Sequence, residues 1–318
     1  MFETIFELPS KISVAITIPG DYRGLLFLRL AAYAMASLVF CALPLLAQNQ
    51  PLAQVTGKHD GKLILVPVRV NNKGPFWFCV DSGASHTVMD PFIVARLKLK
   101  QTAAAATTGT GKGKVHVGHV GPVSIQLGSQ PLTIEDPWII DLSGVPIPKW
   151  VHGLIGAEFF ERFVLELEPN RPLLTLYDQQ KYRPAKNAVS LPLLNEDHKF
   201  FVQATIEVNT NKIVEHKLRI DTGSSDSVAD EVTREGRQVR ETVAGRGLGD
   251  DFKALSGLLQ ALNLGPFRWT NVWGPAIPQP LIGMEIFRRF TTTFDVPHRL
   301  LYLAPNEHLT EKIPAPAQ

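Results

Sequence analysis

Two aspartates stand in similar surroundings and could together carry out acid–base chemistry. Asp81 begins the sequence Asp-Ser-Gly-Ala-Ser, and Asp221 begins Asp-Thr-Gly-Ser-Ser, 140 positions later. Each follows a strand-like run and precedes a hydroxyl residue and a glycine. A glycine at that point permits a tight turn and the close approach of a partner. The pattern predicts two exposed loops, each of which presents one carboxylate.

If the two loops face each other, their carboxylates form a pair that holds one proton. Like charges a few ångströms apart do not both ionise easily, so one acid stays protonated near neutral or mildly acidic pH. The ionised acid can take a proton from water while the protonated acid donates to a substrate carbonyl. We therefore expect Asp81 and Asp221 to be catalytic in a hydrolysis that forms no covalent enzyme intermediate.

Strand-like segments must position these loops, and they occur in the same order in both halves. Residues 63–70 and 76–80 predict a hairpin before Asp81, and residues 200–208 and 216–220 predict one before Asp221. Each half continues with a glycine-rich stretch, an apolar-apolar-glycine triplet, a short helical pattern and a final strand. The glycine-rich stretches hold Gly109, Gly111, Gly113, Gly245, Gly247 and Gly249, and the triplets are Leu154, Ile155, Gly156 and Leu281, Ile282, Gly283.

The repeated order predicts an internal duplication and an all-β fold. Many short strands separated by turns are typical of small barrels, so we expect two similar small closed β-barrel lobes related by a pseudo-dyad, each with a short helix. The expected N-terminal lobe is 58–183 and the C-terminal lobe is 184–305, with a linker near 181–198. Residues 306–318, which end in a Pro-Ala repeat, predict a disordered tail.

The two Asp-hydroxyl-Gly loops and the two triplets resemble the signatures of aspartic peptidases. The spacing is more similar to retropepsins than to pepsins, and the resemblance extends over roughly residues 61–305. It implies the acid-protease fold and an aspartic endopeptidase acting on peptides or proteins. By this resemblance, Ser82 and Thr222 hydrogen-bond across the lobe interface. The resemblance also implies that Gly83, Gly223 and Ser224 belong to the active-site loops and that the triplets support these loops. It implies that the glycine-rich stretches are flaps.

The two loops differ at one position, where Ala84 stands opposite Ser224. A serine hydroxyl there could hydrogen-bond the carboxylate of its own loop and favour the ionised form. Our hypothesis is that Asp221 holds more of the negative charge and that Asp81 holds more of the proton. The glycine-rich stretch of the second half is also more polar than the family pattern, which argues against symmetric closure of the flaps.

The N-terminal segment predicts export from the cytoplasm. Arg23 and Arg29 precede an uncharged apolar run at 30–46, which Ala47 and polar residues follow. A basic region, an apolar segment and a cleavage zone are typical of a signal peptide. The run is also near the lower length limit for a membrane span. Residues 1–48 are thus predicted to be a signal peptide or a membrane anchor, and the protein to be secreted or periplasmic, with membrane attachment only if the segment is uncleaved.

Composition argues against other classes of function. The 318 residues are 45% hydrophobic and 19% charged with a net charge of +2, which fits a globular protein and predicts no nucleic-acid partner. No metal site or cofactor is predicted, because His116 and His119 lack a third ligand. Cys41 lies in the apolar run, and Cys79 is expected to be a small buried side chain that forms no disulfide.

Three interpretations remain open at this stage. The first is a monomeric endopeptidase in which the two lobes of one chain pair with each other. The second is a peptide-binding module of the same fold that has lost turnover. The third is a homodimeric peptidase whose sites form between chains, which the length of the linker would also allow.

Overall fold

The computed structural model describes residues 3–7, 13–17, 49–108, 114–244 and 252–315. The chain divides into two compact units, 1–50 and 51–318. In the first unit, β1 (Glu3–Glu7) pairs in antiparallel fashion with β2 (Ser13–Thr17). Among the described residues, no helix combines the length and apolar character needed to cross a membrane. Residues 18–48, on which the prediction of a signal peptide or anchor depends, lie outside the described residues.

Ten strands of the first half form one sheet, which curls as a half-barrel. They run in the order β11-β10-β5-β6-β13-β7-β12-β9-β8, and β4 pairs with β5 at the side. Helix α2 (Pro91–Leu97) leaves this sheet after β7, and the Asp90 side chain caps it by accepting from the N–H of Phe92. The strands are β4 (Lys58–Asp60), β5 (Leu63–Val70), β6 (Lys73–Val80), β7 (Val88–Met89), β8 (Gln101–Thr108), β9 (Lys114–Val120), β10 (Val123–Leu127), β11 (Gln130–Ile134), β12 (Trp138–Ile139) and β13 (Val151–Ile155).

Eight strands of the second half form another curled sheet. Their order is β20-β24-β19-β18-β22-β21, with β17 beside β18 and β23 beside β22. A 3-10 helix, η3 (Glu231–Glu235), follows β20. The strands are β17 (Leu194–Glu196), β18 (Lys199–Asn209), β19 (Lys212–Asp221), β20 (Val228–Ala229), β21 (Arg237–Ala244), β22 (Phe252–Leu264), β23 (Phe267–Pro275) and β24 (Leu281–Gly283).

A third sheet takes three strands from each half. Its order is β16-β26-β25-β14-β15-β3, and the halves meet where β14 pairs with β25. Helix α3 (Ala157–Arg162) precedes β14, and helix α4 (Met284–Phe287) precedes β25. The strands are β3 (Ala53–Thr56), β14 (Val164–Glu168), β15 (Leu173–Tyr177), β16 (Val189–Pro192), β25 (Phe290–Asp295) and β26 (Leu300–Pro305).

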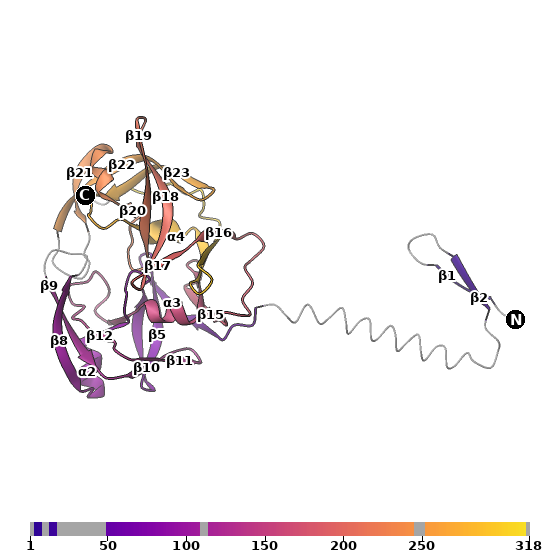
Figure 1. Cartoon of the computed structure of the whole chain (residues 1–318), viewed down its shortest axis with the longest axis horizontal. Coiled ribbons are helices and arrows are strands. Elements are labelled where there is room, and N and C mark those ends of the chain that lie inside the picture. Colours follow the sequence, from indigo (N-terminus) through magenta and orange to yellow (C-terminus); the bar gives the residue numbers. More distant parts are fainter. Residues whose placement is uncertain (1–2, 8–12, 18–48, 109–113, 245–251, 316–318) are drawn as a thin grey trace. The chain divides into compact units, whose positions relative to one another are not determined.

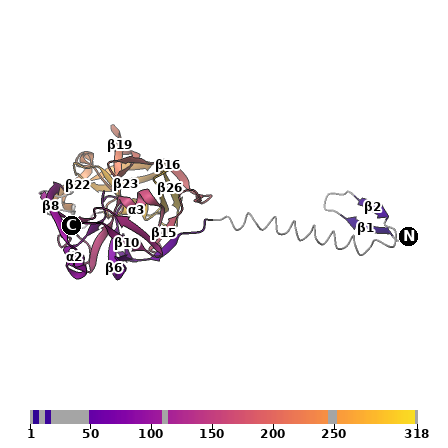
Figure 2. The same cartoon turned by 60° about the horizontal axis from the view of Figure 1, so that its bottom comes forward.

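The arrangement of the three sheets matches the expected all-β, two-lobed architecture. In Figures 1 and 2 the first sheet and α2 lie at one end of the 51–318 unit and the tip of β19 lies at the other, with β15 and β16 to one side. Along β18, buried and less buried residues alternate, as in a strand with one face on the core. In β5 nearly every residue is buried, as expected of a strand covered on both faces.

The ends of the predicted lobes differ from the structure in two respects. Strand β3, which pairs with β15, lies before the predicted start at residue 58. The predicted boundary at 183/184 falls between β15 and β16, inside the single unit 51–318, and it stays a prediction. Residues 306–315, the described part of the segment predicted to be a disordered tail, instead pack on the second half. The Trp269 indole N–H donates to the Leu309 carbonyl at 2.9 Å, and Ile313 is only 8% exposed. Apolar side chains that the terminal Pro-Ala pattern obscured hold this segment in place.

Candidate active site

Both catalytic candidates lie where a strand that pairs in parallel with its neighbour runs into a loop. Asp81 directly follows β6, which pairs in parallel with β13, and its N–H donates to the Ile155 carbonyl at 3.1 Å. Asp221 is the last residue of β19 and pairs with Gly283 of β24, also in parallel. Asp81 is partly buried, and Asp221 is 9% exposed. Equivalent backbone surroundings therefore set the positions of both side chains.

Gly83 and Gly223 bring the two loops into contact. A Cβ on Gly83 would lie 2.6 Å from Cγ of Asp221, and a Cβ on Gly223 would lie 2.6 Å from Cγ of Asp81. Only glycine permits this approach. Each glycine N–H also donates to Oδ1 of the aspartate in its own loop, at 2.8 Å for Asp81 and 3.1 Å for Asp221. The structure thus packs each carboxylate against the glycine of the opposite loop.

Ser82 and Thr222 join the loops by four hydrogen bonds. The N–H of Ser82 donates to Oγ1 of Thr222 at 2.9 Å, and the N–H of Thr222 donates to Oγ of Ser82 at 3.1 Å. The Ser82 hydroxyl then donates to the Ile220 carbonyl at 2.9 Å, and the Thr222 hydroxyl donates to the Val80 carbonyl at 2.8 Å. Both side chains are buried. The cross-lobe contact implied by the family resemblance is therefore present in this structure.

The apolar-apolar-glycine triplets lie directly against these loops. A Cβ on Gly156 would lie 2.3 Å from the carbonyl carbon of His86, and one on Gly283 would lie 2.7 Å from the carbonyl oxygen of Asp226. In both halves the next residue donates its N–H to the loop, Ala157 to the Ala84 carbonyl at 3.0 Å and Met284 to that of Ser224 at 2.8 Å. The triplets, whose apolar members Leu154, Ile155, Leu281 and Ile282 are all buried, thus support the loops.

The two carboxylates differ in their electrostatic surroundings. The pKa of Asp81 is raised to about 7, chiefly by burial and then by the Asp221 carboxylate, while the Gly83 N–H and the Arg219 charge oppose the rise. Asp221 forms an ion pair with Arg219, whose Nη2 donates to Oδ2 at 3.0 Å. The pair therefore combines an acid that favours its protonated form with an acid that contacts a cation.

The Ser224 hydroxyl is turned away from Asp221, contrary to our hypothesis. It donates to Oδ2 of Asp226 at 3.2 Å and accepts from the Asp226 N–H at 3.2 Å. A serine that bonds the backbone two residues ahead closes a local turn, and this competes with other partners. The proposed hydrogen bond from Ser224 to its own catalytic carboxylate is therefore wrong, and Arg219 occupies that oxygen instead.

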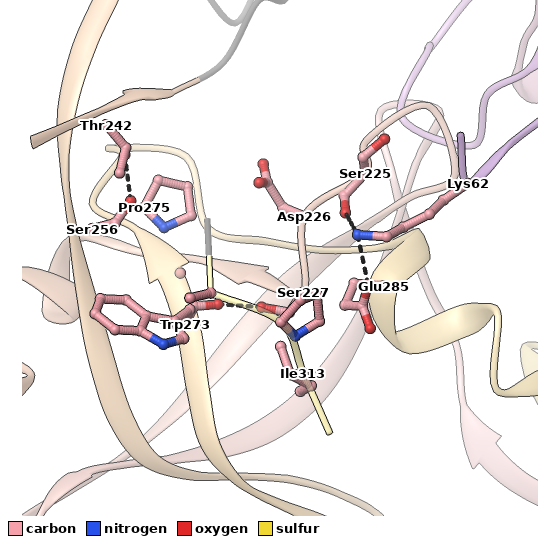
Figure 3. A pocket seen from close by; sticks show the side chains of 13 residues that line it. Lys62, Ser225, Asp226, Ser227, Thr242, Ser256, Trp273, Pro275, Glu285 and Ile313 are labelled. Carbon is pink, nitrogen blue, oxygen red and sulfur yellow. Dashed lines mark hydrogen bonds and ion pairs between the residues drawn. The ribbon is translucent and has the colours of Figure 1, made fainter. Parts of the chain in front are cut away.

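A pocket of about 220 Å³ opens beside the second loop (Figure 3). Ser225 and Asp226 line it, together with Trp273 of β23 and Ile313 of the C-terminal segment. At its edge, Nζ of Lys62 lies 2.6 Å from Oε2 of Glu285 and donates to the Ser225 carbonyl at 3.2 Å. Since Lys62 belongs to the first half, this contact is a second polar link between the lobes.

Some predicted residues cannot be placed. The flap glycines Gly109, Gly111, Gly113, Gly245, Gly247 and Gly249 all lie outside the described residues. Cys79 is buried, as expected, at 1% exposure. In the described part of the chain, no three His, Cys, Asp or Glu side chains gather in a way that could hold a metal ion.

Sequence reasoning missed Arg219, and a signal for it was present. Side chains two apart in a strand point to the same face, so an arginine two positions before Asp221 should lie beside its carboxylate. Lys62 could not be found in this way, because it is 163 positions from Ser225 and contacts it only through the tertiary fold.

Comparison with known proteins finds one family whose sequences resemble part of the first half. Residues 66–159, which include Asp81 and extend from β5 into α3, match the aspartyl protease family. No curated protein matches the chain. Among solved structures, the crystal structure of basic 7S globulin from soybean is similar, with a TM-score of 0.44 and 10% identity, over 79% of this chain and 93% of that chain.

Proposed function

We propose that the chain is an aspartic endopeptidase that hydrolyses peptide bonds with water activated by Asp81 and Asp221. The observation that carries this proposal is the packing of each carboxylate against the glycine of the opposite loop. Two acids in this arrangement share one proton because their charges repel at short range. The match of residues 66–159 to the aspartyl protease family supports the same chemistry.

The proposed reaction needs no group beyond the pair and a water molecule. The ionised carboxylate accepts a proton from water as the water oxygen attacks the peptide carbonyl carbon. The protonated carboxyl donates its proton to the carbonyl oxygen, which gives a neutral tetrahedral diol. The acid that took the water proton then gives it to the amide nitrogen as the C–N bond breaks, and a diol hydroxyl returns its proton to the other carboxylate as the product acid forms. The pair again holds one proton.

Cleavage of a denatured protein substrate from pH 3 to 8 tests the proposal. The chain is compared with its Asp81→Asn and Asp221→Asn variants, because asparagine keeps the shape of aspartate but cannot exchange a proton. We expect both variants to lose activity and a statine-type mimic of the tetrahedral diol to block the parent chain. Activity that survives either substitution would exclude the shared pair.

A peptide-binding module without turnover is the second candidate, and the Arg219 ion pair favours it. A cation held at 3.0 Å from Oδ2 of Asp221 could keep that carboxylate from receiving a proton. A folded parent chain that binds the statine-type mimic but cleaves nothing at any pH would support this candidate.

Where and in what state the protein works is also a proposal. We propose a monomer, since the loops of one chain already supply both carboxylates. We also propose that it acts on peptides or proteins outside the cytoplasm, because the basic and apolar pattern near the N-terminus is typical of export. Gel filtration combined with activity tests this, because activity found only in a dimer fraction would favour a site formed between chains.

A further inference from the structure

We propose that Arg219 fixes the asymmetry of the carboxylate pair, holding the negative charge on Asp221 so that the shared proton resides on Asp81. This inference rests on the proposed function in that it describes the same pair. Arg219 is a positioning residue, because it acts through Asp221 and supplies no atom to the reaction.

The geometry of β19 aims Arg219 at one carboxylate oxygen. Arg219 lies two residues before Asp221 in the strand, and its backbone is fixed by pairing with Leu281 and by a hydrogen bond from its N–H to the Pro280 carbonyl at 3.0 Å. Its Nη2 donates to Oδ2 of Asp221 at 3.0 Å, and its side chain is only 12% exposed. A partly buried contact of this kind is weakly screened by solvent.

The matching position in the first half, in strand β6, carries a neutral group. Cys79 lies two residues before Asp81, as Arg219 does before Asp221, and it is 1% exposed. Burial and the nearby carboxylates raise the pKa of its thiol well above the ordinary value, so the thiol stays uncharged. The two carboxylates thus share equivalent loops and glycine contacts, but among the described residues only Asp221 forms an ion pair with a cation.

The other charged groups near the pair do not reproduce this asymmetry. Asp226, in the second loop, would disfavour negative charge on Asp221, and burial raises the pKa of Asp226 itself. Lys62 is bound to Glu285 and the Ser225 carbonyl, and the Asp60 charge acts on the Cys79 thiol from β4. Among the described residues, Arg219 is the cation in direct contact with the pair.

The proposal predicts how the pair responds when the cation is removed. An arginine in contact with an aspartate favours ionisation by about 1–3 pH units. In Arg219→Gln, Asp221 should take up a proton at a pH higher by that amount. The acidic limb of the pH–rate profile should therefore move to higher pH by about 1–3 pH units. In Arg219→Lys, which keeps the charge, the acidic limb should lie close to its pH in the parent chain. Arg268→Gln is the matched control, because it removes a guanidinium that pairs with Glu207 on the surface, and it should leave the limb unmoved.

Two measurements on the whole chain separate this inference from the proposed function. One is the pH dependence of kcat/KM for the four proteins. The other is the titration of the Asp81 and Asp221 carboxyl carbons by ¹³C NMR, which needs no activity. The parent spectrum should show Asp221 ionising at a lower pH than Asp81. The opposite order would overturn the proposal even if Arg219→Gln does not fold.

Each outcome has a defined meaning. Expected shifts in the NMR titration from an inactive chain would uphold the role of Arg219 and reject the peptidase. An active enzyme whose acidic limb and NMR titration are the same in Arg219→Gln would uphold the peptidase and overturn the role of Arg219. Asp81 ionising before Asp221 in the parent chain would also overturn it.

Discussion

At the scale of single residues, the reciprocal hydrogen bonds of Ser82 and Thr222 hold the two active-site loops, and therefore the two carboxylates, close together. Each hydroxyl accepts from one backbone N–H and donates to one carbonyl across the lobe interface. Loss of one hydroxyl leaves a buried donor and a buried acceptor without their partner, which costs more than the bond itself contributes.

Thr222→Val should therefore weaken both folding and activity. We expect the free energy of unfolding to fall by about 1–3 kcal/mol and kcat/KM to fall by about 10–100-fold, because small misplacements of catalytic groups are costly. Urea unfolding and peptide cleavage measure the two effects. Thr175→Val is the control: this buried hydroxyl has no hydrogen-bond partner in the described structure, so its removal should be nearly neutral. Equal losses of stability and activity in Thr222→Val and Thr175→Val would contradict this role of the reciprocal hydrogen bonds.

The raised pKa of Asp81 predicts how activity depends on pH. Its pKa is raised to about 7 by burial and by Asp221, and the reaction needs the proton that this acid holds. Activity should therefore fall as the pH rises through about 7. A profile of kcat/KM that stays flat from pH 6 to 9 would contradict this assignment.

The same shift predicts a dependence of stability on pH. The folded chain binds the Asp81 proton more tightly than the unfolded chain does, so stability should fall as the pH rises from about 4 to 7. Asp81→Asn removes this dependence and should be more stable than the parent at pH 8, by about 1–2 kcal/mol after allowing for partial exposure. Thermal unfolding at pH 4 and pH 8 gives the comparison, in which a gap that does not widen at pH 8 would count against the shift.

At the scale of elements, the turn between β4 and β5 links the first lobe to helix α4 of the second. Lys62 in this turn pairs with Glu285, which is 2% exposed and also pairs with Arg288 and Arg289. Burial raises the pKa of the Glu285 carboxyl, but the hydrogen bonds and charges of Lys62 and Arg288 outweigh it and leave the pKa below its ordinary value. The link therefore contributes stability above about pH 4 and loses it as the pH falls.

Lys62→Met should destabilise the protein in a way that depends on pH. We expect a loss of about 1–2 kcal/mol at pH 7, because Glu285 stays buried with one partner fewer. The loss should shrink as the pH falls toward 3, because Glu285 takes up a proton and then no longer pairs with the Lys62 charge. Lys217→Met, at an exposed pair with Glu196, should change stability by less than about 0.5 kcal/mol. Urea unfolding at both pH values measures this, and a loss at pH 7 that persists at pH 3 would show that packing, not charge, is responsible.

The elements also show what the sequence could and could not predict. The strands before Asp81 and Asp221 and the short helices after each triplet were predictable, because local periodicity and turn residues determine them. The Ser224 contact was predicted wrongly, since two acceptors were within reach and the sequence does not reveal which one the hydroxyl chooses. The β14–β25 pairing was missed, because strands over 100 residues apart carry no local signal of their partner.

At the scale of the whole molecule, the third sheet makes the two halves interdependent. The halves are joined by the β14–β25 ladder and by the active-site loops, while the segment between β15 and β16 crosses the surface with residues 183–187 exposed. The segment between β15 and β16 therefore contributes much less to holding the two halves together than the β14–β25 ladder and the loop contacts do.

A cut in this segment should leave the active molecule assembled. With a protease site inserted after Lys186, we expect the cleaved chain to elute as one particle and to keep most of its activity. Its unfolding midpoint should become dependent on protein concentration, because unfolding then separates two pieces. Separation of the halves at micromolar concentration without denaturant would show that the interface is weaker than its hydrogen bonds suggest.

The register of the β14–β25 ladder suits an interface between two different halves of one chain better than an interface between two identical subunits. Glu166 pairs with Thr293, and the Thr293 hydroxyl donates to the Glu166 carboxylate at 3.1 Å. The spacing of 127 between the two triplets makes these residues equivalent, so the pseudo-dyad passes between them. In a symmetric dimer of the first half, a residue on the axis would meet its own copy, and two Glu166 carboxylates would then repel each other. Fusion into one chain allows an acid to face a hydroxyl here, and a thiol in β6 to stand where β19 has an arginine. No pair of identical subunits has this freedom.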